Sequence, residues 1–258
     1  MAEGRGIARA RDSEEGEWSE TKVGVPQGAV ISPLLANVYL HYVLDKWANG
    51  WRQEHAAGDV IMVRYADDFV LGFQHRKEAE RFLEQLQERL REYGLELHPE
   101  KTRLIQFGRF AAIARQRDGE GKPETFNFMG FTHICGTTRK GRFNVKRRTM
   151  GKRQAAKLKA IKVALRRRMH LSIAAVGKWL RAVVQGYFNY FAVPGNFPRL
   201  NSFLRELLRL WSQVARRRSQ RALKPAVFYR IAVQYLPSPK ILHPYPTERF
   251  YASSKAPR

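Results

Sequence analysis

The sequence predicts an α+β domain, with helices on one face of an antiparallel sheet, followed by a basic all-α domain. Short β-rich runs alternate with helical periods up to about residue 145, and only long helical periods follow. The charge divides in a similar way. Residues 139–258 carry 29 Lys and Arg against two acidic residues, a net charge of +27, whereas residues 1–138 sum to −3. We expect an irregular lead-in at 1–22, the α+β domain at 23–145, the helical domain at 146–236 and a proline-rich tail at 237–258.

The first expected elements surround a pair of aspartates. A helix should begin at Ser32, with Ser as N-cap and Pro33 at the first helical position, and continue to about Trp47. Two β-rich runs at 60–64 and 69–73 flank the sequence Tyr-Ala-Asp-Asp at 65–68. This pattern is typical of a β-hairpin with carboxylates in its turn.

The remaining elements follow from periodicity. An amphipathic helix over 82–93 should end at Gly94, and strands are expected at 95–97, 104–107 and 126–133. Helices are expected at 155–169, 173–191 and 200–217, with an irregular end from Pro237 to Pro246. The aromatic residues Tyr187, Tyr190 and Trp211 fit either a helical core or a nucleic-acid surface.

Composition limits the functional classes. A half this basic, with Trp and Tyr interleaved, is typical of a phosphate-binding surface, although a solvated basic face is the alternative. Cys135 is the only cysteine, which excludes a disulfide framework and a cysteine-based zinc module and indicates a reducing compartment. No apolar stretch approaches the roughly 20 residues that cross a bilayer, so we expect a cytoplasmic protein with no membrane partner.

Asp67 and Asp68 are the candidate metal ligands. Nucleotidyl transfer uses two divalent metals, one activating the attacking hydroxyl and one bracing the triphosphate. Mg²⁺ takes carboxylate oxygens, and a hairpin turn supplies them from a rigid scaffold. By itself, an Asp-Asp pair is more often ordinary turn chemistry.

The order of several segments favours metal binding by this Asp-Asp pair over ordinary turn chemistry. The segments are GVPQG at 24–28, ISPLLANVYLH at 31–41, VRYADDFVLGF at 63–73, HPEKT at 98–102 and FNFMGF at 126–131. In this order they resemble motifs B, C, D and E of reverse transcriptases, over roughly residues 17–133. The resemblance implies a partial reverse-transcriptase palm and an RNA-directed DNA polymerase that uses Mg²⁺ or Mn²⁺, deoxynucleoside triphosphates and an RNA/DNA primer-template.

The resemblance also implies roles for individual residues. Tyr65 would lie beside the primer terminus, Asp67 would bind metal and Asp68 would be its partner. Lys101 would stabilise the departing pyrophosphate, although a plain surface lysine explains it equally well. The other implied positions are a nucleotide and template contact at Pro26, Gln27 and Gly28, for which a simple helix-leading turn is the alternative, and a primer grip at Phe128, Met129 and Gly130, for which an aromatic core strand is the alternative.

The basic helical half resembles the thumb and maturase domain X of group II intron proteins, on the segment QGYFNYF at 185–191, the arginine runs and the late ILHPYP at 241–246. The implied partner is intron RNA, and the implied setting is the bacterial cytoplasm, at the nucleoid when DNA is the target. His243 is expected to pack rather than to catalyse. The candidate RNA-binding residues are Arg166, Arg167, Arg168, Arg216, Arg217, Arg218 and Arg221.

Reverse transcriptases place another metal-binding aspartate, motif A, before the Pro-Gln-Gly turn, and Asp12 lacks the apolar context of that motif. We therefore expect a truncated enzyme whose isolated chain polymerises poorly, unless an upstream fragment supplies the fingers and motif A. The alternatives are a catalytically inactive, maturase-like RNA-binding splicing cofactor and a degenerate fragment without selected function.

Overall fold

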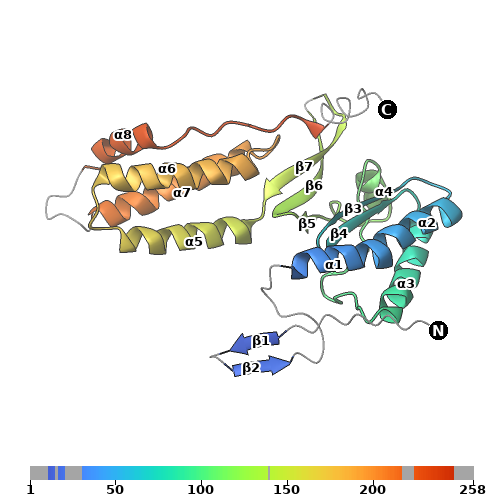
Figure 1. Ribbon diagram of the computed structural model, residues 1–258. Coiled ribbons are helices and arrows are strands. Elements are labelled where there is room, and N and C mark those ends of the chain that lie inside the picture. Colours follow the sequence, from blue (N-terminus) through green and yellow to red (C-terminus); the bar gives the residue numbers. More distant parts are fainter. Residues whose placement is uncertain (1–10, 15–16, 21–30, 139, 217–223, 247–258) are drawn as a thin grey trace, which may run out of the picture. The chain divides into compact units, whose positions relative to one another are not determined.

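The computed structural model of the chain describes residues 11–14, 17–20, 31–138, 140–216 and 224–246 (Figure 1). The chain divides into two compact units, Met1–Leu104 and Ile105–Arg258, and each is described by itself. In the described ranges, no helix has both the length and the apolar character needed to cross a membrane.

The first unit begins with strands β1 (Arg11–Glu14) and β2 (Glu17–Glu20), which pair antiparallel. The lead-in expected to be irregular therefore contains strand structure. A long helical segment follows as α1 (Ser32–Leu40), the π-helical turn η1 (His41–Asp45) and α2 (Lys46–His55). It extends beyond the predicted end near Trp47, because the indole of Trp51 is buried in the core of this unit.

Strands β3 (Val60–Tyr65) and β4 (Asp68–Phe73) form the predicted hairpin, and α3 (Arg76–Glu92) follows it. Gly94, at φ 67°, ends α3 with hydrogen bonds from Gly94 N to Arg91 O and from Leu95 N to Leu90 O, the Schellman arrangement. The predicted strands at 95–97 and 104–107 do not form. Leu95 and Leu97 instead pack against the core formed by η1, α2, β3 and α3.

The second unit contains α4 (Ala111–Arg117) and the three-stranded antiparallel sheet of β5 (Phe126–Phe128), β6 (Phe131–Thr137) and β7 (Phe143–Thr149), in the order β5-β6-β7. β7 was not predicted, because its basic sequence FNVKRRT has little apolar character. The predicted antiparallel sheet is thus divided into separate small sheets. An α+β architecture is nevertheless confirmed for the part preceding α5.

In the described residues of the second unit, four helices follow the sheet: α5 (Gly151–Arg167), α6 (Ile173–Phe191), α7 (Phe197–Arg216) and α8 (Pro225–Tyr235). α7 buries a stripe at helical spacing that includes Leu200, Phe203, Leu207 and Trp211. α8 was not among the predicted helices; it begins at Pro225, and proline fits the first helical position. Tyr187 and Trp211 are core residues, whereas Tyr190 is exposed.

The sheet β5–β7 belongs to the same compact unit as the helices. One link between them is a buried polar contact: Asn196 accepts a hydrogen bond from Thr149 N at 2.9 Å and donates to Thr149 Oγ1 at 2.7 Å and to Phe191 O at 2.8 Å. The helices that follow the sheet begin with α5 at Gly151. Asn196 joins β7 to these helices.

Candidate active site

The candidate active site is the turn between β3 and β4. The strands pair in a register that opposes Val60 with Phe73 and Tyr65 with Asp68. Because strand side chains alternate between the two faces and paired residues share a face, Tyr65 and Asp68 lie on one face of the hairpin. This face is open, since 63% of Tyr65 is exposed. Arg64 has the opposite orientation and is half-buried.

Ala66 and Asp67 are the two central residues of the turn. The φ angle of Ala66 is 54°, while Asp67 has no positive φ, the sign pattern of a type II′ hairpin turn. A positive φ costs a residue with a Cβ about 1–2 kcal/mol, so neighbouring contacts must hold this turn in place. Asp67 and Asp68 are both exposed. The turn thus presents two adjacent carboxylates to solvent on a defined backbone.

The guanidinium of Arg64 supplies those contacts. It binds Asp45 with both prongs, Nε to Oδ1 at 2.7 Å and Nη2 to Oδ2 at 2.6 Å. Its Nη1 donates to Asn37 Oδ1 at 2.9 Å and to the carbonyl oxygen of Ala66 at 2.8 Å. His41 Nδ1 lies 3.4 Å from Asp45 Oδ2. We call Asn37, Asp45 and Arg64 the turn-holding cluster, which joins α1 and η1 to the turn.

The charges of the turn-holding cluster are strongly paired. Hydrogen bonding to Arg64 lowers the pKa of Asp45 against the opposing effect of burial, and the charges of Arg64 and His41 lower it further. The same hydrogen bonds raise the pKa of Arg64. Since the positive charge of Arg64 is matched by Asp45, the carboxylates of Asp67 and Asp68 keep their own charge available for another cation.

The chemistry of the turn fits a hard divalent ion. Asp67 and Asp68 offer exposed carboxylate oxygens, the ligands that Mg²⁺ prefers. Neither residue forms an ion pair within the described ranges. Over the same ranges, no group of three or more His, Cys, Asp or Glu gathers where it could enclose a metal. The turn therefore offers two adjacent carboxylates of the kind that Mg²⁺ prefers.

A comparison with known protein families identifies the family to which the segment around the turn belongs. Residues 6–133 match the family described as reverse transcriptase (RNA-dependent DNA polymerase). These residues belong to the reverse transcriptase family. A search of curated proteins finds no match. The predicted reverse transcriptase relationship is confirmed, and the matched segment contains the Tyr-Ala-Asp-Asp hairpin together with its turn-holding cluster.

Three other predicted positions lie in the matched reverse transcriptase segment: Lys101, the Pro-Gln-Gly turn and the primer grip. Lys101 is exposed in a turn closed by hydrogen bonds from Lys101 N and Thr102 N to His98 O. Within the described ranges Lys101 forms no hydrogen bond or ion pair with Asp67 or Asp68, so its role stays a prediction. Pro26, Gln27 and Gly28 lie outside the described residues.

The predicted primer-grip residues form the β5–β6 hairpin of the second unit. Met129 and Gly130 are its central turn residues, with φ angles of 51° and 75°, as in a type I′ turn. The hydroxyl of Tyr190 on α6 donates to Met129 O at 2.9 Å, and Met150 N donates to Gly130 O at 3.1 Å. The ring of Tyr190 also stacks on Phe131. The hairpin is therefore fixed against the helices of its own unit.

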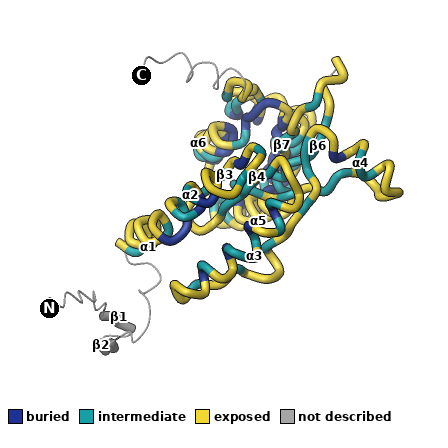
Figure 2. The backbone as a smooth tube through the Cα atoms, turned by 90° about the vertical axis from the view of Figure 1, so that its right-hand side faces the viewer, coloured by how far each residue is buried: buried dark blue, intermediate teal, exposed yellow. Residues whose placement is uncertain are grey.

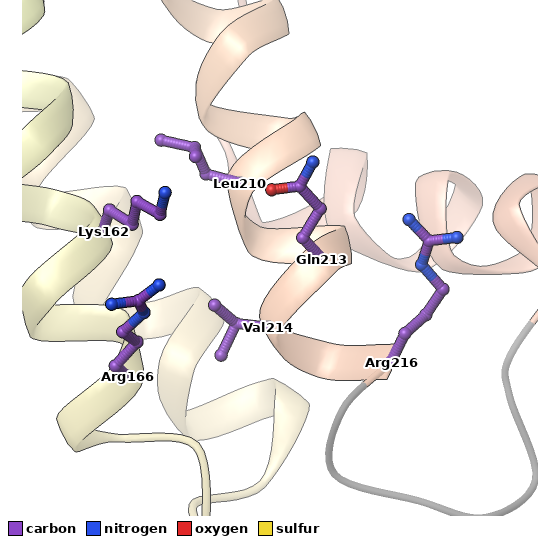
Figure 3. Close-up of a pocket in the computed structure, with 6 residues that line it drawn as sticks. All are labelled: Lys162, Arg166, Leu210, Gln213, Val214 and Arg216. Atoms are coloured by element: carbon purple, nitrogen blue, oxygen red, sulfur yellow. The ribbon is translucent and has the colours of Figure 1, made fainter.

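The predicted RNA-binding arginines fall into different environments. Lys162 and Arg166 extend from α5 toward α7 (Figure 3), where they line a cavity of about 450 Å³ with Leu210, Gln213, Val214 and Arg216. Arg167 is exposed. Arg168 is engaged in packing, since its guanidinium lies 4.5 Å from the ring centroid of Trp179 and its Nη1 donates to Ala164 O. Arg217, Arg218 and Arg221 lie outside the described residues.

Proposed function

We propose that this chain acts as a group II intron-type reverse transcriptase and maturase. Its Tyr-Ala-Asp-Asp turn takes part in Mg²⁺-dependent nucleotidyl transfer, and its basic helical part binds intron RNA. One observation carries the proposal: two exposed carboxylates sit on a held hairpin turn within a reverse transcriptase segment.

The proposed chemistry assigns a task to each residue of the turn. When bound, divalent metals activate the attacking hydroxyl and brace the triphosphate. Asp67 and Asp68 would provide oxygen ligands from the turn, with any further carboxylate supplied from outside the described residues or by a fragment acting in trans. Tyr65, on the same face as Asp68, would present its ring to the primer end. The open face with Ile61, Val63 and Tyr65 leaves room for a nucleic-acid strand.

The RNA-binding part of the proposal is supported by charge. Residues 139–258 have a net charge of +27, and the α5/α7 cavity brings Lys162, Arg166 and Arg216 to one place. Each phosphate contact by Lys or Arg releases counterions and makes affinity fall with salt. Lys162 and Arg166, on successive turns of α5, suit a phosphate backbone.

Nucleotidyl transfer is tested with Asp67→Ala and a matched control, Asp59→Ala, which removes an exposed aspartate just before β3. Binding of Mn²⁺, followed by its electron paramagnetic resonance signal, is measured with and without primer-template. Mg²⁺-dependent primer extension on poly(rA)/oligo(dT) is measured with the chain alone and with a fragment carrying motif A. We expect Asp67→Ala to lose the Mn²⁺ site and any extension, and Asp59→Ala to retain both. Equal Mn²⁺ binding by both variants would overturn the proposal.

A second candidate function is an RNA-binding cofactor without catalysis, favoured by the confinement of the excess charge to the second half of the chain. The double charge reversal Lys162→Glu/Arg166→Glu on α5 is compared with Lys77→Glu/Arg81→Glu on the exposed face of α3. The α5 variant should weaken binding to structured RNA and flatten its salt dependence. A wild-type chain that binds RNA but neither binds Mn²⁺ nor extends primers would support this candidate over the polymerase.

A further inference from the structure

The turn-holding cluster uses the guanidinium of Arg64 almost completely. An arginine has five N–H donors, and the guanidinium of Arg64 donates four hydrogen bonds: two to Asp45, one to Asn37 and one to Ala66 O. The side chain of Arg64 is only 14% exposed. A guanidinium this buried and this fully paired is not available to bind substrate. Its hydrogen bond to the turn goes to the carbonyl of Ala66, the residue with the positive φ.

The acceptors of Arg64 are themselves fixed. Asn37 donates through Nδ2 to Pro33 O at 2.9 Å, which directs its Oδ1 toward Arg64. Asp45 is the last residue of the π-helical turn η1, a departure from the α-helix that often marks functional sites. His41 approaches the same carboxylate from one turn earlier. Through these hydrogen bonds, α1 and η1 fix the position of the β3–β4 turn.

We propose that Arg64 is a positioning residue that sets the geometry of the Asp67 and Asp68 carboxylates by holding the carbonyl of Ala66. The inference deepens the proposed function and rests on it for its catalytic meaning. Without the hydrogen bond to Ala66 O, the turn can relax from its positive φ, and the carboxylates that follow change direction with the backbone. The helix that orients Asn37 and Asp45 thereby controls the metal ligands.

The geometry requires arginine in particular. The fork of the guanidinium binds both oxygens of Asp45 while Nη1 reaches two further acceptors, whereas the ammonium of lysine is a point charge with three donors. Arg64→Lys keeps the charge but cannot make the same four contacts. The effect of that substitution separates positioning from simple charge balance.

The matched control is Arg52→Lys. Arg52 lines the same cavity of about 370 Å³ as Asp45 and Arg64, and its Nη2 donates to Asn49 Oδ1 at 2.8 Å. Among the described residues, Arg52 forms no hydrogen bond with the turn. The same chemical change thus takes place in the same cavity without altering the support of Ala66.

The experiment uses the full chain and two readouts. Amide hydrogen exchange is measured by NMR at residues 66–68 and, as an internal reference, at the core residues Leu86 and Leu90 of α3. Mn²⁺ affinity is measured by electron paramagnetic resonance. Arg64→Lys should speed exchange at 66–68, leave Leu86 and Leu90 protected, and weaken Mn²⁺ binding about 10- to 100-fold, as loss of outer-shell support does. Arg52→Lys should change neither readout.

Other outcomes are decisive as well. Unchanged exchange at 66–68 in Arg64→Lys overturns the proposal, and so does an equal loss of protection at Leu86, because the cluster would then serve only general stability. If Arg64→Lys does not fold, Asn37→Ala replaces it and should give a smaller rise in exchange at 66–68; no rise would count against the proposal. If the wild-type chain binds no Mn²⁺, the proposed function fails, while the exchange rates still test the hold of Arg64 on the turn.

Discussion

The β3–β4 and β5–β6 hairpins each contain a strained turn residue that a side chain holds in place, and the two side chains differ. Both turn through two residues, and in both the first is not glycine and has a positive φ, 54° at Ala66 and 51° at Met129. In both, a side chain donates to the carbonyl of that residue: Arg64 Nη1 to Ala66 O at 2.8 Å, and Tyr190 OH to Met129 O at 2.9 Å. Each turn is held at the residue that carries the strain.

The two devices differ in chemistry. Arg64 is charged and paired with Asp45, whereas Tyr190 is neutral and stacks on Phe131. The first hairpin leaves Asp67 exposed to solvent, and the second packs Gly130 toward the ring of Phe191. We call Arg64 with Asp45 the polar clamp and Tyr190 with Phe131 the aromatic clamp. The polar clamp holds a turn that presents carboxylates to solvent, and the aromatic clamp holds a turn that packs against helices. This difference predicts distinct responses to substitution and to pH.

The largest effect should come from Asn196→Ala, which removes the buried link between β7 and the helices beside the second hairpin. Asn196 is fully buried, and its loss leaves Thr149 N and Phe191 O without their partner. Unsatisfied buried groups of this kind cost about 3 kcal/mol in the free energy of unfolding. Urea unfolding measures the change. Asn201→Ala, at an exposed position of α7, should stay within about 0.5 kcal/mol; similar values for the two variants would disprove a structural role for the link.

A glycine exchange tests the turns directly. Gly130→Ala adds a Cβ at φ 75°, and we expect a loss of about 1–2 kcal/mol in the free energy of unfolding. Ala66→Gly is the reciprocal change at φ 54°, where relief of strain and the added freedom of glycine oppose one another, so the unfolding midpoint should move little. Thermal or urea unfolding of the pair decides the matter. A loss in Ala66→Gly as large as in Gly130→Ala would show that the two turns are not alike in strain.

The parts of the fold that the sequence predicted are those with strong local signals. The β3–β4 hairpin and the helix ending at Gly94 have alternation, helical spacing and a glycine stop in agreement. β7 and α8 were missed because the first is rich in Lys and Arg and the second begins at a proline. The strands expected at 95–97 and 104–107 have suitable residues, yet pairing depends on a neighbouring strand that local sequence does not reveal.

The sequence predicted the hairpin turn that carries Asp67 and Asp68, but not the residues that hold this turn in place. Asp67 and Asp68 stand in a recognisable turn, but the cluster of Asn37, Asp45 and Arg64 joins residues up to 27 positions apart. One signal was present in the sequence. Arg64 follows Val60 and Met62 on the inward face of β3, where a charged residue needs a partner. Which carboxylate would meet it depended on the π-helical turn, and no periodicity indicated that turn.

Tyr190→Phe tests the aromatic clamp with a smaller expected effect. The change deletes the hydroxyl that donates to Met129 O and keeps the ring that stacks on Phe131. A single hydrogen bond of this kind contributes about 1 kcal/mol. Amide exchange should rise at Met129 and Gly130 and stay unchanged at 66–68. Tyr229→Phe on α8, whose ring is also partly exposed, is the control, and equal exchange at Met129 in both variants would show that the hydroxyl does not hold the turn.

The smallest effect should come from acid, and it should reach only the polar clamp. Arg64 lowers the pKa of Asp45 below its ordinary value of 3.8, with a further contribution from His41. The stabilisation is therefore fully present above that ordinary value and is lost as the pH falls through the lower folded value. Being partly exposed, the pair contributes at most about 1 kcal/mol. The NMR signal of Arg64 Nε–H, which donates to Asp45 Oδ1, should shift with a midpoint below 3.8 and should not titrate in Asp45→Asn. The Met129 amide should report no such transition in the wild type. A midpoint at or above 3.8 would mean that Arg64 does not stabilise the ionised form of Asp45. The proposed difference between a charged clamp and a neutral clamp would then be wrong.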